Sequence, residues 1–453
     1  MNHDFADKGP GAAQPSTYAP SAALGGTKGV WYMVLVLATV QATASLDQIV
    51  LLILMQGIKT SLNLSDMQVS LIDGAAFALF YAVSVIVCGR LADRVNRRNM
   101  LLIGMIGWNV AMIFAGFSQS FAQLALARIA IGIAQGTLIT TTVAIISDRA
   151  PPELRGRGVT LLFSGSTLGG AAASFLGGGL LHLFSLRDVG QLLFGVTFAP
   201  WQLVLMICGG IGLALAPLLL TVEEPARSVS AQQEPFRILP YLMQNRRSFV
   251  PLLACSACFI MAILAISGWG SILLFRNVGM SPITVGVTLG FTSLGGAILA
   301  APLGGWLSDG FVKRDPQKGR MTLLIILLPI AALSALMLVV VAVPFIVILG
   351  FTLIGVTATI VSSLLITILS ELVPSDGRGR IASLFGLVSI VCGMGIAPTL
   401  VATVTDHIFH DESKLPLSLV VVSVPAIIVA TILAVRSLPH VCALRADVLS
   451  QAR

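Results

Sequence analysis

Long apolar stretches recur along the whole chain, and they limit its possible folds more than any other feature. A helix of about 20 apolar residues crosses the roughly 30 Å of hydrocarbon in a bilayer. Only 10% of the residues are charged, whereas a soluble domain carries about 25%. We therefore expect a membrane protein with no large soluble domain. Its twelve predicted spans lie at 31–56, 68–92, 100–118, 121–147, 159–184, 201–221, 250–275, 282–308, 321–341, 345–369, 381–404 and 415–436.

The predicted spans form two sets of six, which sets the domain boundaries. We expect an all-α membrane protein with a first bundle at 30–221 and a second at 250–437. A linker at 222–249 joins them, and its part at 235–247 could form an amphipathic helix at the membrane surface. Residues 1–29 are rich in Ala, Gly, Pro and Ser, so we expect a disordered tail. Residues 438–453 are expected to form a second tail.

Two internal repeats support this six-plus-six arrangement. The first has an offset of 216 residues: Ser65, Gly74, Gly89 and Asp93 recur as Ser281, Gly290, Gly305 and Asp309. The second has an offset of 223: Asp148, Pro151 and Arg155-Gly156-Arg157 recur as Glu371, Pro374 and Arg378-Gly379-Arg380. Repeats half a chain apart indicate duplication. In a membrane protein, duplication indicates a transporter with two pseudo-symmetric halves.

The distribution of basic residues predicts the orientation. Loops on one side, with the linker and the last segment, hold 20 of the 27 Lys and Arg residues. The opposite loops hold four: Lys59, Arg187, Arg276 and Lys414. Cytoplasmic loops carry the excess of basic residues, so both termini and the linker are expected in the cytoplasm. Because the basic residues sit in these short loops, the net charge of +7 does not indicate nucleic-acid binding.

Three charged residues lie well inside predicted spans: Asp47, Asp73 and Arg128. An ionisable group in hydrocarbon costs about 2.5–3.5 kcal/mol or more, so it usually faces a cavity or a partner. Thr43 shares a helix face with Asp47, and Gln135 shares one with Arg128. Two interpretations follow. The residues form a static ion pair that orients helices, or two acids share one base and the surplus carboxylate exchanges protons.

The second bundle has no equivalent charges. At the repeat offsets Asp73 corresponds to Leu289, and Arg128 corresponds to Phe351. Trp269 and Thr292 are its candidates for a central cavity, beside Thr43, Gln48 and Gln135 from the first bundle. A cavity with one charged wall and one mostly apolar wall suits an amphiphile, with its polar head on the first bundle.

Other motifs favour packing over chemistry. Cys255 and Cys258 lie on one apolar helix without further ligands, so packing is favoured over a metal or redox site. His407 and His410 are interpreted as a surface cluster with neighbouring acids. Glycines crowd residues 165–179, where close static packing and sliding between helices are both consistent with the pattern. No nucleophile–base set or nucleotide-binding loop occurs, so we expect no enzyme activity, cofactor or metal.

The basic loop of the second span carries a family resemblance. Its pattern is Gly89-x-Leu91-x-Asp93-Arg94-x-x-Arg97-Arg98, with a degenerate copy at 305–314. This pattern resembles the signature loop of the major facilitator superfamily, and Arg128 with Gly132 and Gly136 is similar to that superfamily's fourth-helix pattern. The resemblance covers about residues 31–437 and implies two six-helix bundles that rock around a central site. The proline of the superfamily's antiporter motif is missing, which leaves the direction of coupling open.

Within the superfamily, the segment Leu46-Asp47-Gln48, with Ile58-Lys59 and Leu64-Ser65-Asp66, resembles the Spinster-like lipid transporters and their bacterial relatives. The resemblance implies that Asp47 binds a proton and that Arg128 is its partner. Two positions depart from the family pattern. Gln48 stands where an arginine is common, and Gln135 stands where bacterial relatives can carry a glutamate. Asp73 is a candidate to take over part of the role.

The same resemblance implies a gate at the cytoplasmic ends. In the first bundle Gly89 belongs to the signature loop, Asp93 would cap the start of the eleventh span, where the helix dipole favours a carboxylate, and Arg97 would bridge to Asp148. Asp309, Lys313 and Glu371 would form the matching lock in the second bundle.

These observations predict a monomeric inner-membrane secondary transporter that couples protons to the movement of a lysolipid or sphingoid-like amphiphile. A carrier of drugs or small organic acids with the same machinery is the first alternative. A membrane sensor without transport is the second, and the paired gates argue against it.

Overall fold

The computed structural model describes residues 27–92, 94–186, 197–224, 238–340, 343–374 and 377–451. Within these ranges every regular element is a helix. Twelve helical stretches are long and apolar enough to cross a membrane, from Lys28–Leu62 to Glu412–Ala446. The expected fold class and the number of spans are therefore confirmed.

The first half comprises the first six spans. Its elements are α1 (Thr27–Leu62), α2 (Asp66–Ser70), η1 (Leu71–Ala75), α3 (Ala76–Ala92), α4 (Arg97–Gly116), α5 (Phe121–Gln135), α6 (Thr137–Arg149), α7 (Pro152–Leu186), α8 (Pro200–Leu215) and η2 (Ala216–Thr221). The second span consists of α2, η1 and α3, and the fourth consists of α5 and α6.

The second half follows the short linker helix α9 (Ile238–Gln244). Its elements are α10 (Arg246–Arg276), α11 (Pro282–Arg314), α12 (Gly319–Leu336), η3 (Met337–Val339), α13 (Pro344–Glu371), α14 (Arg378–Val388), η5 (Ser389–Ile396), α15 (Ala397–Thr403), η6 (Val404–Phe409), η7 (Glu412–Lys414) and α16 (Leu415–Gln451). The eleventh span consists of α14, η5, α15 and η6.

Small polar residues begin the helices that follow short loops. The Ser65 hydroxyl accepts a hydrogen bond from the Gln68 amide, and the Gln68 side chain accepts one from the Ser65 amide. At the start of α11 the Ser281 hydroxyl likewise accepts a hydrogen bond from the Thr284 amide. Such caps satisfy amides that have no partner inside the helix. The repeated serines therefore mark equivalent helix starts in the two halves.

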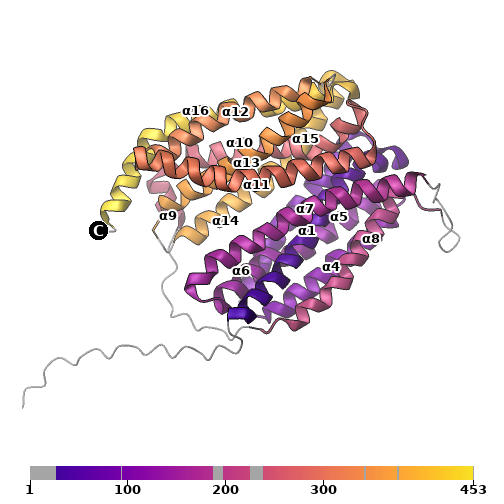
Figure 1. The fold of residues 1–453 in the computed structure, drawn as a ribbon, viewed down its shortest axis with the longest axis horizontal. Helices are drawn as coiled ribbons and strands as arrows, with labels where there is room; N and C mark the ends of the chain where they lie inside the picture. Colours follow the sequence, from indigo (N-terminus) through magenta and orange to yellow (C-terminus); the bar gives the residue numbers. More distant parts are fainter. Residues whose placement is uncertain are drawn as a thin grey trace, which may run out of the picture.

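The two halves meet at one end of the molecule and diverge toward the other, where the chain's C terminus lies (Figure 1). We call the first the Glu412 end and the second the Glu371 end. One buried apolar core includes Leu54 and Trp108 of the first half and continues into Ile272 and Val401 of the second. A separate core, which includes the fully buried Leu365, belongs to the second half alone. The halves thus share packing only through the first of these cores.

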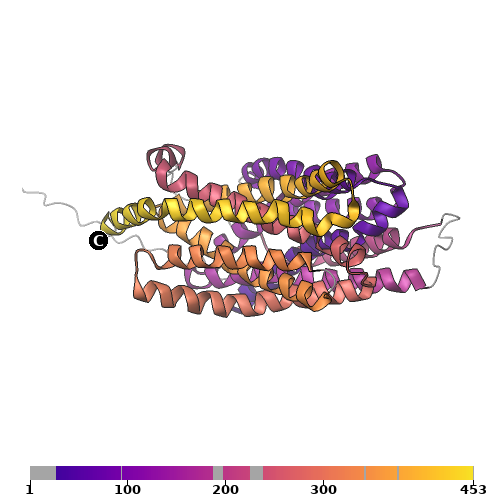
Figure 2. The ribbon, with the colours of Figure 1, turned by 90° about the horizontal axis from the view of Figure 1, so that it is seen from above.

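At the two ends of the chain the structure is compared with the expected tails. Residues 438–451 continue α16 as a helix along the second half, where a tail was expected (Figure 2). Val441 is buried there and the Arg445 guanidinium donates to the Gln317 carbonyl, so packing extends the helix past its apolar stretch. The expected disordered tail lies outside the described residues up to residue 26, and α1 begins at Thr27. Within the expected amphipathic segment, residues 238–244 are helical.

Candidate functional site

Asp47 is sealed inside the first half, where it is bonded to a neutral partner. Its side chain lies on α1, the residue is 2% exposed, and its carboxylate accepts a hydrogen bond of 2.7 Å from Gln135 Nε2 on α5. Gln135 Oε1 accepts in turn from Gln48 Nε2 at 3.2 Å. In the described part of the chain, no ion pair joins Asp47 to a cation. Three sequence candidates therefore form one hydrogen-bonded chain between α1 and α5.

Arg128 pairs with Asp73 across helices α5 and η1. The distance from Arg128 Nη2 to Asp73 Oδ1 is 3.7 Å, and Arg128 Nε donates to the Ile72 carbonyl at 3.4 Å. The guanidinium also lies 4.9 Å from the centre of the Phe77 ring, a cation–π contact. Arg128 is thus paired with Asp73, and Asp47 is the acid of this group that has no base as partner.

Asp73 differs from Asp47 because it faces the second half. It lies in the π-helical turn η1, a widened turn of a kind that is frequent at functional sites. A Cβ added to Gly268 of α10 would lie 3.8 Å from Asp73 Oδ2. One added to Gly74 would lie 2.7 Å from the Met394 carbonyl oxygen in a second π-helical segment, η5. The carboxylate of Asp73 therefore sits at the contact between the halves.

A cavity of about 370 Å³ lies between the two halves. Hydroxyl groups come from both sides: Ser45, Ser166, Thr167 and Ser174 from the first half, and Ser267, Thr292, Ser293 and Thr359 from the second. Most apolar lining residues belong to the second half, including Ile266, Leu289 and Phe351. Its described lining contains no charged side chain. On the side of the first half, where charged groups were expected, the polar lining groups are hydroxyls. Asp47 lies on the opposite side of α1 from the lining residues Ser45 and Ile49.

Of the five residues expected to line the cavity, one lines it and four do not. Thr292 lines the cavity. Gln48 and Gln135 belong to the Asp47 chain, and the Thr43 hydroxyl donates to the Val40 carbonyl of its own helix. Trp269 is 2% exposed, and its indole N–H donates to the Pro398 carbonyl at 3.1 Å. The latter four therefore stand behind the lining.

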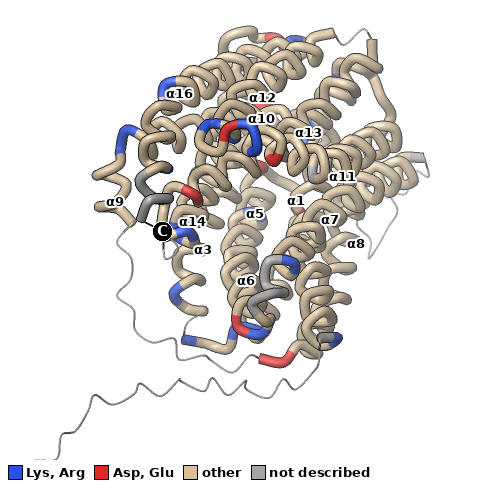
Figure 3. The backbone as a smooth tube through the Cα atoms, turned by 60° about the vertical axis from the view of Figure 1, so that its left-hand side comes forward, with Lys and Arg blue, Asp and Glu red and all other residues tan. Residues whose placement is uncertain are grey.

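At the Glu371 end, the first half carries the expected bridge. Arg97 at the start of α4 pairs with Asp148 near the end of α6. Gly89 lies where α3 passes α6, with Thr140 Cγ2 3.8 Å from the position of an added Cβ. The remaining expected gate residue, Asp93, lies outside the described residues. Basic segments gather around α6, α14 and α9 at this end (Figure 3).

The second half has a matching bridge with a different base. Glu371 pairs with Arg320 at the start of α12 and, at 3.0 Å, with Arg445 of α16. Asp309 and Lys313 are exposed near the end of α11. In the expected lock of Asp309, Lys313 and Glu371, the base that pairs with Glu371 is therefore Arg320 and not Lys313. Arg320 lies 223 residues after Arg97, the offset that also separates Glu371 from Asp148.

Two further features were missed by sequence reasoning. Glu224, at the start of the linker, accepts hydrogen bonds from the amides of Arg97 and Arg98, and so caps α4. At the Glu412 end an ion-pair cluster joins the halves, with Lys59 and Arg276 as its bases. Both bases had been counted only as loop charges, and the acids opposite them were the signal that could have found the cluster.

The family follows from comparison with known proteins. The model of the Major Facilitator Superfamily matches residues 37–398. The chain belongs to this superfamily. It is therefore an integral, multi-pass membrane transporter, and the family resemblance inferred from the signature loop is confirmed.

Relatives within the superfamily are of several kinds. The chain is 28% identical to an MFS-type efflux pump of Mycolicibacterium smegmatis, over 68% of this chain and 70% of the relative. It is 23% identical to Protein spinster of Drosophila melanogaster, over 67% of this chain and 49% of the relative. A solved bacterial homologue of the lysosomal transporter Spinster, inward-facing and unoccupied, superposes with a TM-score of 0.72 at 21% identity, covering 94% of this chain and 99% of that one.

In the described residues, no group of three or more His, Cys, Asp or Glu side chains is arranged to hold a metal ion. His407 and His410 line a surface pocket with Asp406 and Asp411, beside the ion-pair cluster. Cys255 is buried and Cys258 partly buried, without a disulfide.

Proposed function

We propose that this transporter moves an amphiphilic organic molecule, such as a lysolipid or a sphingoid-like compound, by proton-coupled alternating access. The observation that carries the proposal is the placement of a surplus buried acid, Asp47, directly behind a cavity of mixed character. Ser45 and Ile49 of α1 line the cavity, and Asp47 lies between them on the opposite side of the helix. A change in the charge of Asp47 therefore acts on the helix that carries these two lining residues and also Leu52 and Ile53.

The cavity supports an amphiphile as substrate. Its volume falls within the roughly 300–1,000 Å³ that ligand pockets occupy. Hydroxyl groups from both halves offer hydrogen bonds to a polar head, and Ile266, Leu289 and Phe351 offer a surface for hydrocarbon. The likeness to Protein spinster agrees with this choice.

The orientation follows from the basic residues. The loops at the Glu371 end carry Arg97, Arg149 and Arg320, and an excess of such residues marks the cytoplasmic side. We infer that the Glu371 end faces the cytoplasm and the Glu412 end the outside of a bacterial inner membrane. The halves are therefore closed outside, with access from the cytoplasm.

The test is uptake by proteoliposomes with and without an imposed pH gradient, with a lysolipid panel and a drug panel. Asp47→Asn is expected to abolish flux driven by the pH gradient while the melting temperature is kept. Asp73→Asn is the matched control: it slows transport, because Arg128 loses its partner, and it keeps the response to pH. If Asp73→Asn alone removes that response, the proton site is Asp73 and the assignment to Asp47 is wrong.

A carrier of drugs or small organic acids is the second candidate. The efflux pump of M. smegmatis and a gallate transporter of Pseudomonas putida, 25% identical over 270 residues, favour it. Competition by hydrophilic acids, with none by lysolipids, would replace the lipid by this substrate class. Specific binding without any flux would instead indicate a sensor.

A further inference from the structure

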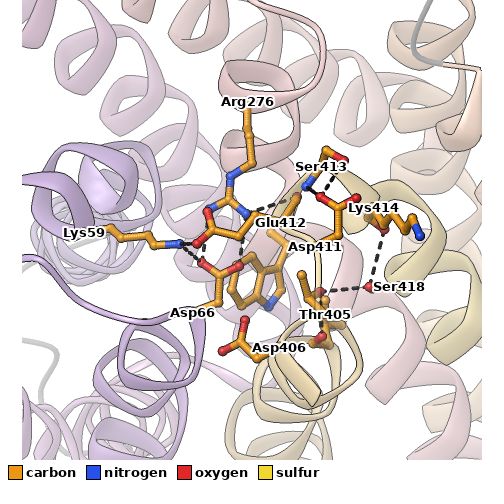
Figure 4. Close-up of polar contacts among 12 residues, drawn as sticks. Lys59, Asp66, Arg276, Thr405, Asp406, Asp411, Glu412, Ser413, Lys414 and Ser418 are labelled. Carbon is orange, nitrogen blue, oxygen red and sulfur yellow. Dashed lines mark hydrogen bonds and ion pairs between the residues drawn. The ribbon is translucent and has the colours of Figure 1, made fainter. Parts of the chain in front are cut away.

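Four charged side chains close the Glu412 end, and we call them the four-charge lock. Lys59 of α1 and Asp66 of α2 belong to the first half. Arg276 of α10 and Glu412 of η7 belong to the second. Each half thus contributes one acid and one base, and Figure 4 shows the four side chains converging from both halves.

Every member of the lock contacts both opposite charges. Within the halves, Lys59 Nζ lies 2.6 Å from Asp66 Oδ1, and Arg276 Nη2 lies 3.3 Å from Glu412 Oε2. Between the halves, Lys59 Nζ lies 2.6 Å from Glu412 Oε1, and Arg276 Nη1 lies 3.0 Å from Asp66 Oδ2. The charges therefore alternate around a closed ring of four ion pairs, two inside the halves and two across them.

We propose that the four-charge lock is a latch that opens without leaving any charge unpaired. When the halves separate, the two pairs that cross between them break. Lys59 keeps Asp66, and Arg276 keeps Glu412, so each half carries a neutral pair of its own. When the halves close, Lys59 meets Glu412 and Arg276 meets Asp66. The attraction in these two pairs favours closure.

Three of the four side chains are largely buried. The Asp66 side chain is fully buried, those of Lys59 and Arg276 are 9% and 12% exposed, and that of Glu412 is 55% exposed. A buried charge that loses its partner is strongly destabilising. A gate built from a single acid in one half and a single base in the other would leave both without a partner at each opening. In the ring, each charge keeps one partner within its own half.

Neighbouring bonds hold the members of the second half in place. The Arg276 guanidinium donates to the Glu412 carbonyl, and Asn277 Nδ2 donates to the Ser413 carbonyl at 2.6 Å. Hydrogen bonds from the amide and hydroxyl of Ser413 to the Asp411 carboxylate fix this loop and hold the pKa of Asp411 below its usual value. The loop therefore moves with α10 and carries Glu412 along with Arg276.

An acid outside the ring also bonds across the halves. Asp406 of η6 accepts from the Met67 amide at 3.0 Å, at the N-terminus of α2. A carboxylate is favoured at that position by the helix dipole. Asp406 thus adds to closure, and it stands apart from the ring because it contacts an amide instead of a cation.

Exchange of charges within one half tests the latch. In Lys59→Asp/Asp66→Lys the first half keeps its internal pair, but both pairs across the halves become repulsive. Adding Arg276→Glu/Glu412→Arg restores opposite charges across the halves. The readout is the rate at which a membrane-impermeant maleimide modifies the cavity-lining substitution Ser267→Cys from the outside, in a chain without its native cysteines.

We expect the exchange in one half to raise the modification rate at least tenfold, and the exchange in both halves to return it to within about threefold of the parent. Unchanged modification in the one-half variant, or no recovery in the four-substitution variant, would overturn the latch. Neither substrate nor a proton gradient is needed, so this result is separate from the outcome of the transport test. Vesicles of both orientations show independently which side the lock faces.

Neutralising variants provide a second measurement. Lys59→Met/Asp66→Asn removes one half's pair and leaves the other intact, whereas Asp66→Asn alone leaves two bases facing one acid. The single substitution is therefore expected to lower the melting temperature more than the double. An equal or larger loss in the double variant contradicts the claim that charges pair within each half.

Discussion

Gly178 of α7 gives the sharpest test of closure at the Glu412 end. A Cβ added there would lie 2.7 Å from the Pro282 carbonyl oxygen and 2.8 Å from Gly286 Cα, both in α11 of the other half. These neighbours are backbone atoms, which have no rotamer that would make room. Because both belong to the opposite half, moving the halves apart relieves the clash, and unfolding is not required. Gly178→Ala is therefore expected to favour the state that is open outside.

The matched control is the next residue of the same helix. A Cβ added to Gly179 would meet no atom within 4 Å. Replacing a helical glycine by alanine stabilises a helix by roughly 0.5–1 kcal/mol, and this gain applies to both positions. Overpacking costs about 1–3 kcal/mol, and only Gly178 incurs it. A difference of that size corresponds to about 5- to 150-fold in the ratio of open to closed molecules.

The assay is again modification of Ser267→Cys from the outside by an impermeant maleimide. Gly178→Ala should raise the rate by a factor in that range, and Gly179→Ala should leave it unchanged. Equal rates in the two variants would refute the reasoning. A faster rate in Gly178→Ala together with a large fall in melting temperature would mean that the added methyl group destabilises the fold. That result would contradict the claim that separation of the halves removes the clash.

Two further predictions concern the Glu371 end. Arg97→Ala should lower the melting temperature more than Arg320→Ala. When Arg320 is removed, Glu371 still pairs with Arg445 at 3.0 Å. Thermal unfolding of both purified variants measures the difference. Equal losses would count against it. Glu224→Ala should cost about 1 kcal/mol of unfolding free energy in denaturant titrations, because the helix it caps loses an acceptor for two amides. Glu223→Ala is the control, since that side chain is 68% exposed and loses only a surface ion pair with Arg149, which contributes little. An equal cost would exclude capping as the cause.

The repeats predicted the architecture, but they located one gate residue wrongly. An offset of 216 aligns the signature loop with its copy and assigns Lys313 to the place of Arg97. In the structure α11 extends to Arg314, six residues past the counterpart of the last residue of α3, so the extra residues mainly lengthen this helix. The bridging base is therefore Arg320, at the offset of 223 that the end of α13 already showed. Extra residues between two spans change the register of every later residue.

The partners of the buried charged residues were harder to predict than the fact that these residues lie inside the spans. Asp47, Asp73 and Arg128 were each placed well inside a predicted span, and that placement alone gives no pairing. Which acid meets Arg128 depends on the rotation of α1 and α3 about their axes, which is set by packing with α5 and α7. Gly165 and Gly169 of α7 lie against the backbone of α1, where an added Cβ would be 2.2 Å from a carbonyl oxygen in each case. That close approach within one half supports static packing for these two glycines.

The two ends of the molecule follow one electrostatic rule. At the Glu371 end the ion pairs Arg97–Asp148 and Arg320–Glu371 each lie inside one half. At the Glu412 end each half also keeps an internal pair, although two pairs cross between the halves. Among the described residues, each of these ion-paired charges therefore keeps a partner within its own half when the halves move apart. Asp47 differs from them, because its bonded partner is a neutral glutamine.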